Sequence, residues 1–227
     1  MNLIIVPSVI NVVNKPLSYC DRRSSFTSEQ RYEQTLLQLE TIRKKVPNSY
    51  ISFVEASPIS EEMENNLRAK VDYYFNVSEI PEVPEATNSP AKGYGEAMQL
   101  ISYLHSEHFK EIRKHCTTVS KFGGRIRFTD DFVFVVPDMP RIHVEFVDPQ
   151  PRYMNTVFYT MPETDVDSYM ESLQECILEK DFLEGKDHAS IEHMLYKTWF
   201  GKGKSYIHVD YIGVEGFNAP SGFYYRV

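Results

Sequence analysis

The first third of the chain alternates short apolar runs with longer amphipathic segments. The apolar run 3–6 is followed, after a polar loop, by a segment with apolar residues at helical spacing. These residues are Tyr32, Leu36, Leu39, Ile42 and Val46. Further apolar runs at 51–54 and 71–77 enclose a polar segment, 60–70, that predicts a second helix. Short apolar strands separated by helices predict a parallel sheet with right-handed crossovers.

The ends of the first helix are marked by the sequence. Thr27 and Gln30 have the spacing of a capping box, in which each side chain accepts a hydrogen bond from the backbone amide of the other residue. At the other end, Lys44 and Lys45 favour the negative end of the helix, and Pro47 ends it. We therefore expect a helix that begins after Thr27 and ends before Pro47.

The second half has a different pattern. Segment 81–90 contains three prolines, so we expect a loop without regular structure, followed by a helix carrying Ala97, Leu100 and Leu104. Short strands separated by turns are predicted at 132–136, 142–147, 155–160, 206–209 and 223–227. Two more amphipathic helices are predicted over 166–177 and 191–198. The expected fold class is α/β, with a mainly parallel sheet flanked by helices and antiparallel additions in the second half.

Composition narrows the class of protein. A chain of 227 residues with 42% hydrophobic and 25% charged residues has the size and composition of one globular domain. A net charge of −8 disfavours a nucleic-acid partner, which needs a broad basic surface. Cys20, Cys116 and Cys176 are widely spaced and odd in number, which indicates a reducing, cytoplasmic location. The longest apolar run, 3–10, is too short to cross a membrane.

Two segments place cations beside glycines in this acidic chain. Segment 121–128 reads KFGGRIRF, and segment 92–96 reads KGYGE. Arginine can bind two phosphate oxygens at once, lysine supplies a point charge, and glycine lets the backbone approach a ligand. Both segments therefore indicate a local diphosphate site, although glycine beside arginine also occurs in ordinary hairpins.

Polar residues at strand ends are further candidates, because ligands gather at the carboxyl ends of parallel strands. Pro7 and Ser8 follow the first strand, and Glu55 ends the second, where a carboxylate can bind a ribose or a base edge. The first strand is followed by neither GxGxxG nor GxxxxGK, which disfavours a nicotinamide dehydrogenase and a P-loop kinase.

The order of these features resembles the GT-A type glycosyltransferases, and more narrowly the small members encoded by large DNA viruses of algae and by some bacteria. The segments that carry the resemblance are 4–8, 24–35, 46–57, 92–96, 121–132, 156–159, 190–193 and 212–216. They span nearly the whole chain.

The resemblance implies transfer of a sugar from a UDP-, GDP- or dTDP-linked donor to a hydroxyl of a glycan or glycoprotein, commonly with Mn or Mg. It implies a single domain, 1–227, with a nucleotide-binding half, 1–116, and an acceptor-side half, 117–227, acting in the cytoplasm, or in the host cytoplasm for a viral protein. The residues expected at the nucleotide sugar are Pro7, Ser8, Arg31, Glu55, Lys92, Lys121 and Arg125.

The resemblance leaves the metal ligands open. GT-A enzymes usually carry Asp-X-Asp after a middle strand, where this chain has Lys121 to Arg125. Asp130 and Asp131 are the candidate metal ligands, with Asp131 also a candidate catalytic residue, although adjacent acids are typical of turns. The literal Asp-X-Asp at 165–167 precedes a helix, where capping is the favoured role.

Glu192 is the candidate general base. It matches by resemblance the late acidic residue that takes the acceptor proton in inverting GT-A enzymes. Its position in the first turn of a predicted helix is also favourable for any acid, because the amino end of a helix is positive.

Two other functions remain open from the sequence. His143 with Glu145, and His208 with Asp210, each share one face of a predicted strand and could serve a metal-dependent hydrolase, although alternation is usual in half-exposed strands. A non-catalytic sugar-binding domain could use stacking aromatic residues near the end of the chain. Those residues are Phe217, Phe223, Tyr224 and Tyr225, which could equally pack a terminal strand.

Overall fold

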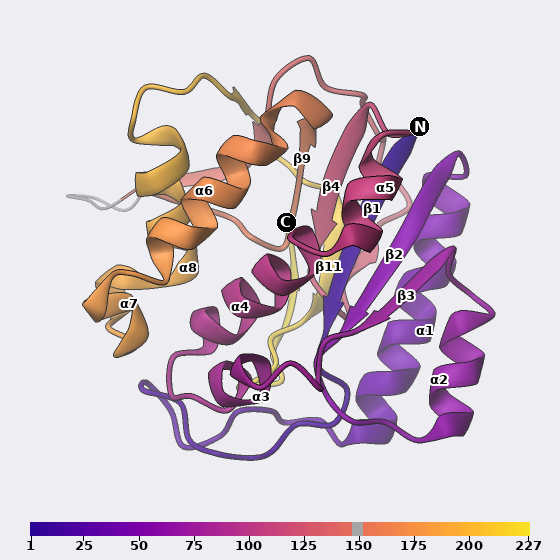
Figure 1. Cartoon of the computed structure of the whole chain (residues 1–227), viewed down its shortest axis with the longest axis vertical. Coiled ribbons are helices and arrows are strands. Elements are labelled where there is room, and N and C mark those ends of the chain that lie inside the picture. Colours follow the sequence, from indigo (N-terminus) through magenta and orange to yellow (C-terminus); the bar gives the residue numbers. More distant parts are fainter. Residues whose placement is uncertain (147–151) are drawn as a thin grey trace.

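A computed structural model describes residues 1–146 and 152–227, and its centre is a seven-stranded sheet with the order β10-β6-β9-β4-β1-β2-β3 (Figure 1). Four neighbouring strands are parallel. They are β4 (Thr118–Phe122), β1 (Asn2–Ser8), β2 (Ser49–Glu55) and β3 (Tyr73–Asn76). Their carboxyl ends therefore lie at one edge of the sheet, which carries Ser8, Glu55 and the turn after Phe122.

The second half of the chain supplies the antiparallel additions. β9 (Phe158–Pro162) pairs antiparallel with β4 and with β6 (Arg141–Ile142), and β10 (Ile207–His208) pairs parallel with β6. Outside this sheet, β5, β11 and β12 form a three-stranded sheet, while β7 pairs with β8. Their bounds are β5 (Arg127–Phe128), β11 (Val214–Phe217), β12 (Tyr224–Arg226), β7 (Val144–Phe146) and β8 (Arg152–Met154). The predicted fold class is confirmed.

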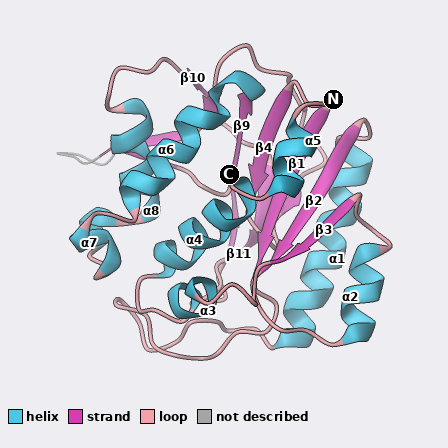
Figure 2. Ribbon diagram, in the orientation of Figure 1, coloured by secondary structure: helices cyan, strands magenta, loops and turns pink. Residues whose placement is uncertain are grey.

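Helices cover both faces of the main sheet (Figure 2). On one face lie α1 (Ser28–Lys45) and α2 (Glu61–Arg68). The other face carries α4 (Lys92–Leu104) and α6 (Val166–Cys176). The shorter helices are α3 (Glu82–Thr87), α5 (Glu107–Arg113), α7 (Lys180–Leu183) and α8 (Ile191–Leu195). Short 3₁₀ turns occupy Glu163–Asp165 and Asp187–Ala189, and a π-helical turn occupies Tyr196–Phe200.

The alternation of β1 explains how one strand serves two cores. Successive side chains of a strand point to opposite faces. Ile4 and Val6 belong to the core under α1 and α2, whereas Leu3 and Ile5 belong to the core under α4 and α6. Both faces of the strand are therefore buried, as a continuous apolar run in a central parallel strand requires.

The ends of α1 form as predicted. The Thr27 hydroxyl accepts from the Gln30 amide at 3.3 Å, and the Gln30 side chain accepts from the Thr27 amide at 3.0 Å, which completes the capping box. At the other end, the amide of Val46 donates to the carbonyl of Ile42 at 2.8 Å before Pro47 follows. The residues that cap this helix are thus readable from sequence.

Two predicted elements were wrong. Segment 81–90 was expected to lack regular structure but contains α3, in which Val83 and Ala86 are buried. Pro84 is tolerated because amides in the first helical turn have no partner within the helix. Segment 132–136 was expected to form a strand but pairs with no strand of the described chain. The ring of Phe132 stacks on Phe128 at a centroid distance of 3.7 Å, which fixes the segment by packing instead.

Other predicted elements differ in their bounds. The strand expected at 142–147 is divided between β6 and β7, and Val147 lies outside the described residues. The helix expected over 191–198 is α8 followed by the π-helical turn. α5 was not predicted. Over the described ranges, every helix is either too short or too polar to cross a membrane.

Candidate functional site

A polar pocket of about 430 Å³ opens at the carboxyl ends of β1 and β4. Its wall comes from both halves of the chain: the end of β1, the start of α4, the turn after β4, and the start of α8. Most of the residues that the sequence places at a nucleotide sugar line this pocket. They are Pro7, Ser8, Arg31, Lys92, Lys121 and Arg125, and Glu192 lines it as well.

The turn after β4 is held tightly against the end of β1. A Cβ atom added to Gly124 would lie 2.7 Å from the carbonyl oxygen of Pro7, so only glycine fits there. Gln38, fully buried on α1, donates from Nε2 to the Gly123 carbonyl at 2.6 Å and accepts at Oε1 from the Arg125 amide at 2.7 Å. One side chain therefore fixes both ends of the turn.

Arg125 is the unusual residue of this turn. Its φ angle of 70° is the only positive value at a non-glycine position in the described chain. Such a conformation is costly for residues with a side chain and is concentrated at functional sites. Arg125 lines the pocket, and its Nη1 atom is buried without a hydrogen-bond partner among the described residues. Burial lowers the pKa of Arg125 to about 10, so the group stays charged at neutral pH.

Lys121 is buried beside the pocket and is neutralised by the protein. It is 2% exposed and forms an ion pair with Glu96 of α4. Its Nζ also donates to the Thr156 carbonyl at 2.5 Å and lies 5.8 Å from the centre of the Tyr159 ring. These contacts compensate for the lost hydration of a buried ammonium group.

Lys92 and Glu192 face the pocket from the first turns of two helices that are in close contact. A Cβ atom added to Gly93 would lie 2.9 Å from the Cβ of Ile191, so α4 and α8 touch at this point. Lys92 is accessible to solvent in the pocket. Even so, the surrounding protein limits its hydration and lowers its pKa, and repulsion from Arg125 adds to this effect. Glu192 accepts from the Thr156 hydroxyl at 3.0 Å.

The glycines of segment 92–96 therefore serve helix packing. A Cβ atom at Gly95 would lie 2.8 Å from the Cα of Thr87 on α3, as Gly93 is close to α8. The sequence interpretation, in which these glycines admit a ligand to the backbone, is not what the structure shows. Their small size instead brings α3 and α8 against α4, which sets the position of Lys92.

Glu55 and Arg31 hold the loop that follows β1. Glu55 is fully buried and does not line the pocket; its Oε1 accepts from the amides of Ile10 at 3.0 Å and Ser57 at 2.9 Å. Burial raises the pKa of Glu55 to about 7. Arg31 donates from Nε to the Val9 carbonyl at 2.9 Å, and burial lowers the pKa of Arg31 well below its usual range. The expected contact of Glu55 with a ribose is thus replaced by support of the loop.

Asp130 and Asp131 are not brought to this pocket. Asp130 is almost fully exposed, with its carboxylate 3.8 Å from Lys44 Nζ. Asp131 accepts from Arg226 Nη2 at 2.9 and 3.0 Å. Both acids follow the short strand β5, and neither lines the pocket, although both are close to Arg125 in sequence. Asp165 and Asp167 form ion pairs with Lys204 and Arg113, and Asp165 makes no side-chain capping bond.

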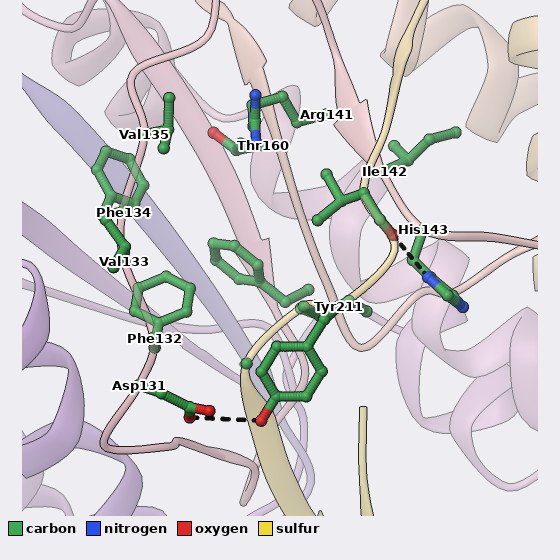
Figure 3. A pocket seen from close by; sticks show the side chains of 14 residues that line it. Asp131, Phe132, Val133, Phe134, Val135, Arg141, Ile142, His143, Thr160 and Tyr211 are labelled. Atoms are coloured by element: carbon green, nitrogen blue, oxygen red, sulfur yellow. Dashed lines mark hydrogen bonds between the residues drawn. The ribbon is translucent and has the colours of Figure 1, made fainter.

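A second, mainly apolar pocket of about 270 Å³ lies under segment 132–135 (Figure 3). Tyr211 donates to Asp131 at its rim at 3.4 Å, and His143 Nδ1 is 2.7 Å from the Val209 carbonyl. The ring of His143 lies 5.5 Å from that of His208. Within 1–146 and 152–227, no three His, Cys, Asp or Glu residues are grouped to hold a metal, here or elsewhere.

Several wall residues were not singled out from sequence as site residues. Glu96 had a readable signal, because it lies four positions after Lys92 and so on the same face of α4. Thr156, and Gln38 behind the wall, had none, since their roles depend on contacts between distant segments. Of the four candidate aromatic residues, Phe217 and Tyr225 line the pocket, whereas Phe223 and Tyr224 are exposed.

Comparison with known proteins supports the architecture. No family model matches the sequence, and no curated protein is similar to it at a significant level. Among solved structures, the fold is similar to core-mannan synthase A from Aspergillus fumigatus in its Mn/GDP form. The match has a TM-score of 0.52 and 10% identity, and it covers 100% of this chain and 80% of the other. At this identity the likeness shows the fold alone, a mainly parallel α/β sheet flanked by helices with antiparallel additions.

Proposed function

We propose that this chain is a glycosyltransferase that moves a sugar from a nucleoside-diphosphate donor to a hydroxyl group of a glycan or glycoprotein. The observation that carries the proposal is the polar pocket at the carboxyl ends of β1 and β4. In a GT-A architecture this edge is where a nucleotide belongs. Here it combines cations suited to a diphosphate with one acid, Glu192, suited to an acceptor hydroxyl.

The reaction needs two kinds of assistance. The acceptor oxygen forms a bond to the anomeric carbon, the bond from that carbon to the diphosphate oxygen breaks, and the electron pair leaves with the nucleoside diphosphate. We assign stabilisation of this growing negative charge to Arg125 and Lys92. Of the cations that line the pocket, Arg23 and Arg31 are bound to backbone carbonyls and Lys121 is paired with Glu96. Lys121, already paired with Glu96, positions the wall.

We assign the general-base role to Glu192. Its carboxylate lines the pocket and accepts only the Thr156 hydroxyl among the described side chains, which orients it and leaves the other oxygen for an acceptor proton. This assignment corresponds to an inverting transfer. Asp131 is left out of the catalytic proposal, because its carboxylate is bound to Arg226 outside the pocket.

The nucleoside is assigned to the end of β1. Pro7 and Ser8 line the pocket there, and the loop beyond them is fixed by Arg31 and Glu55. We propose that Arg31 and Glu55 hold this nucleoside-binding surface in place and make little contact with the nucleoside themselves. The donor pocket takes residues from both 1–116 and 117–227, so donor binding within the proposed single domain is shared by the two halves.

The expected Mn or Mg ion does not fit this pocket well. The resemblance implies such an ion, and the similar structure was solved with Mn. Divalent ions of this kind bind several oxygen ligands, mainly carboxylates. The described wall offers two separate carboxylates, Glu96 and Glu192, each with a protein partner, and Asp130 and Asp131 lie elsewhere. No reaction step is therefore assigned to a metal.

The proposed location is the cytoplasm. The three free thiols support a reducing, cytoplasmic location.

The test is a panel of UDP-, GDP- and dTDP-linked sugars. A matching donor should raise the melting temperature of the purified chain and should be consumed when glycan acceptors are added. Glu192→Gln should keep the donor-induced stabilisation and lose transfer, while the control Glu171→Gln, an exposed acid on α6, should retain both. If no donor in the panel stabilises the protein, the proposal is wrong.

The same panel separates the alternative functions. A non-catalytic sugar-binding domain would be stabilised by free glycans and would consume no donor, with Phe217 and Tyr225 as stacking surfaces in the pocket. A metal-dependent hydrolase would require tightly bound zinc, for which the described residues offer no ligand group.

A further inference from the structure

The charge of the pocket is opposite to that of the whole chain. The chain carries a net charge of −8, yet the pocket wall carries five cations and two anions, a difference of +3 over the described lining residues. The cations are Arg23, Arg31, Lys92, Lys121 and Arg125, and the anions are Glu96 and Glu192. A local excess of positive charge inside an acidic protein attracts an anion and repels a further cation.

Most of these charged side chains already have partners in the protein. The charged side chains that have none indicate which kind of ligand the pocket binds. Arg23 Nη1 donates to the Thr87 carbonyl at 2.8 Å, and Arg31 is bound to the Val9 carbonyl. Lys121 and Glu96 neutralise each other. The wall is then left with Lys92 and Arg125 against Glu192, which is the charge pattern of a phosphate site rather than of a cation site.

The conformation of Arg125 is a second, independent observation. A buried guanidinium atom without a partner is unfavourable, and so is a positive φ angle at a residue with a side chain. Gln38 and the close approach of Gly124 to β1 hold the residue in this state. The fold therefore maintains an unused donor on a cation that lines the pocket, an arrangement that an anionic oxygen would satisfy.

We infer that Arg125 and Lys92 bind the donor diphosphate directly and take the place of a divalent metal ion, so that donor binding does not require Mn or Mg. This inference rests on the proposed function. The positive charge that stabilises the leaving diphosphate comes from these two fixed side chains and not from a metal ion. A divalent ion would have to enter beside Lys92 and Arg125 and compete with protein partners for both carboxylates of the wall.

The test is titration calorimetry with GDP, UDP and dTDP as probes, and with inorganic pyrophosphate. The purified chain is dialysed against EDTA, titrated, and titrated again in Mn. We expect at least one nucleoside diphosphate to bind with the same affinity in both buffers and to bind more weakly as salt is raised. Arg125→Met and Lys92→Met should each weaken that binding by about tenfold or more, the loss of one charge-assisted hydrogen bond.

Two controls protect this test. Arg127→Met removes a partly exposed cation that lies two positions after Arg125 but pairs with Glu215 outside the pocket, so this variant should leave binding unchanged. Arg125→Asn keeps a residue type that tolerates a positive φ angle, so a loss of binding by this variant at an unchanged melting temperature reports the guanidinium and not misfolding.

Three other results of the calorimetry would contradict the inference, and one of them would also contradict the proposed function. Binding that disappears in EDTA and returns with stoichiometric Mn would overturn the inference and leave the proposed function standing. Binding in EDTA that Arg125→Met and Lys92→Met leave unchanged would also overturn it. If no nucleoside diphosphate bound with or without Mn, the proposed function and the inference would both be rejected.

Discussion

Two groups of charged residues in this molecule both contain acidic and basic residues but differ in burial and in their ion-pair partners. The pocket group lies in or directly behind the polar pocket and consists of Arg31, Glu55, Lys92, Glu96, Lys121, Arg125 and Glu192. The surface group surrounds the turn after β5 and consists of Lys44, Lys45, Asp130, Asp131 and Arg226. In the surface group the charges are solvated and each has a partner. In the pocket group all except Lys92 are buried or half-buried, and three cations, Arg31, Lys92 and Arg125, form no ion pair with a carboxylate of the described residues.

The comparison shows that burial and imbalance mark a site better than residue type or sequence pattern. Adjacent acids such as Asp130 and Asp131 look like metal ligands in a sequence, but solvent and neighbouring lysines satisfy them at little cost. A buried, unpaired charge is unfavourable for folding, so its retention calls for another explanation, and binding is the direct one.

The sharpest test of the comparison is turnover after Glu192→Gln. The amide keeps the size of the side chain and a contact with Thr156 but cannot accept a proton, so turnover should fall by about 10² to 10⁴. Donor affinity, measured by calorimetry, should stay unchanged. A variant that turns over at nearly the normal rate would remove Glu192 from the mechanism.

Lys121→Met should have the largest effect on folding. It leaves the Glu96 carboxylate without its partner and should lower the free energy of unfolding by about 3 to 5 kcal/mol. The double variant Lys121→Met with Glu96→Gln removes both charges and should recover much of the loss. Urea denaturation measures both; equal instability of the single and double variants would show that the ion pair is not the cause.

Glu55 predicts a pH dependence of stability. Its pKa is about 7 in the folded protein and near 4.5 when unfolded, so folding favours the protonated form. The contribution of Glu55 to stability should therefore be fully present below pH 4.5 and should be lost, by up to about 3 kcal/mol, as the pH rises through 7. Glu55→Gln should flatten this part of the profile, as measured by unfolding at pH 5 and pH 8. A profile identical to that of the natural chain would assign the dependence to other groups.

Arg125→Gly separates stability from binding at one residue. Glycine adopts a φ angle of 70° without strain, a relief of about 1 kcal/mol, which its greater freedom in the unfolded chain offsets. The melting temperature should stay close to that of the natural chain while nucleoside-diphosphate affinity falls. Strong destabilisation would mean that the guanidinium supports the fold and is not reserved for a ligand.

Asp131→Asn should have the smallest effect. The variant loses the Arg226 contact at an exposed position, so melting temperature and nucleotide affinity should both be unchanged within error. A clear loss of donor binding or of Mn-dependent activity in this variant would show that Asp131 acts in the functional site, contrary to the distinction drawn between the two groups.

The sequence predicted the elements that depend on local patterns. The capping box at Thr27, the apolar strand β1 and the parallel half of the sheet all follow from spacing along the chain. The cation-rich wall was also predicted, because Lys92 begins α4, Lys121 lies near the end of β4, and Arg125 follows that strand.

What the sequence could not give depends on distances between remote segments. Nothing local shows that Gln38 reaches Gly123, that Glu55 accepts from the amide of Ile10, or that Asp131 pairs with Arg226. Segment 132–136 alternates like a strand, but strand formation needs a partner, and Phe132 instead enters the core. These differences come from tertiary packing, which overrides local propensity.

The clamp formed by Gln38 has a mechanical consequence. The amide belongs to an 18-residue helix that lies on the far side of the sheet from α4, so the turn bearing Arg125 is anchored to α1. Lys92 instead begins α4. The distance between Arg125 and Lys92 is thus set by the separation of the two helical layers across the β-sheet. Substitutions that change the volume of the core, and not only those in the pocket, should therefore change the length of ligand that fits between the two cations.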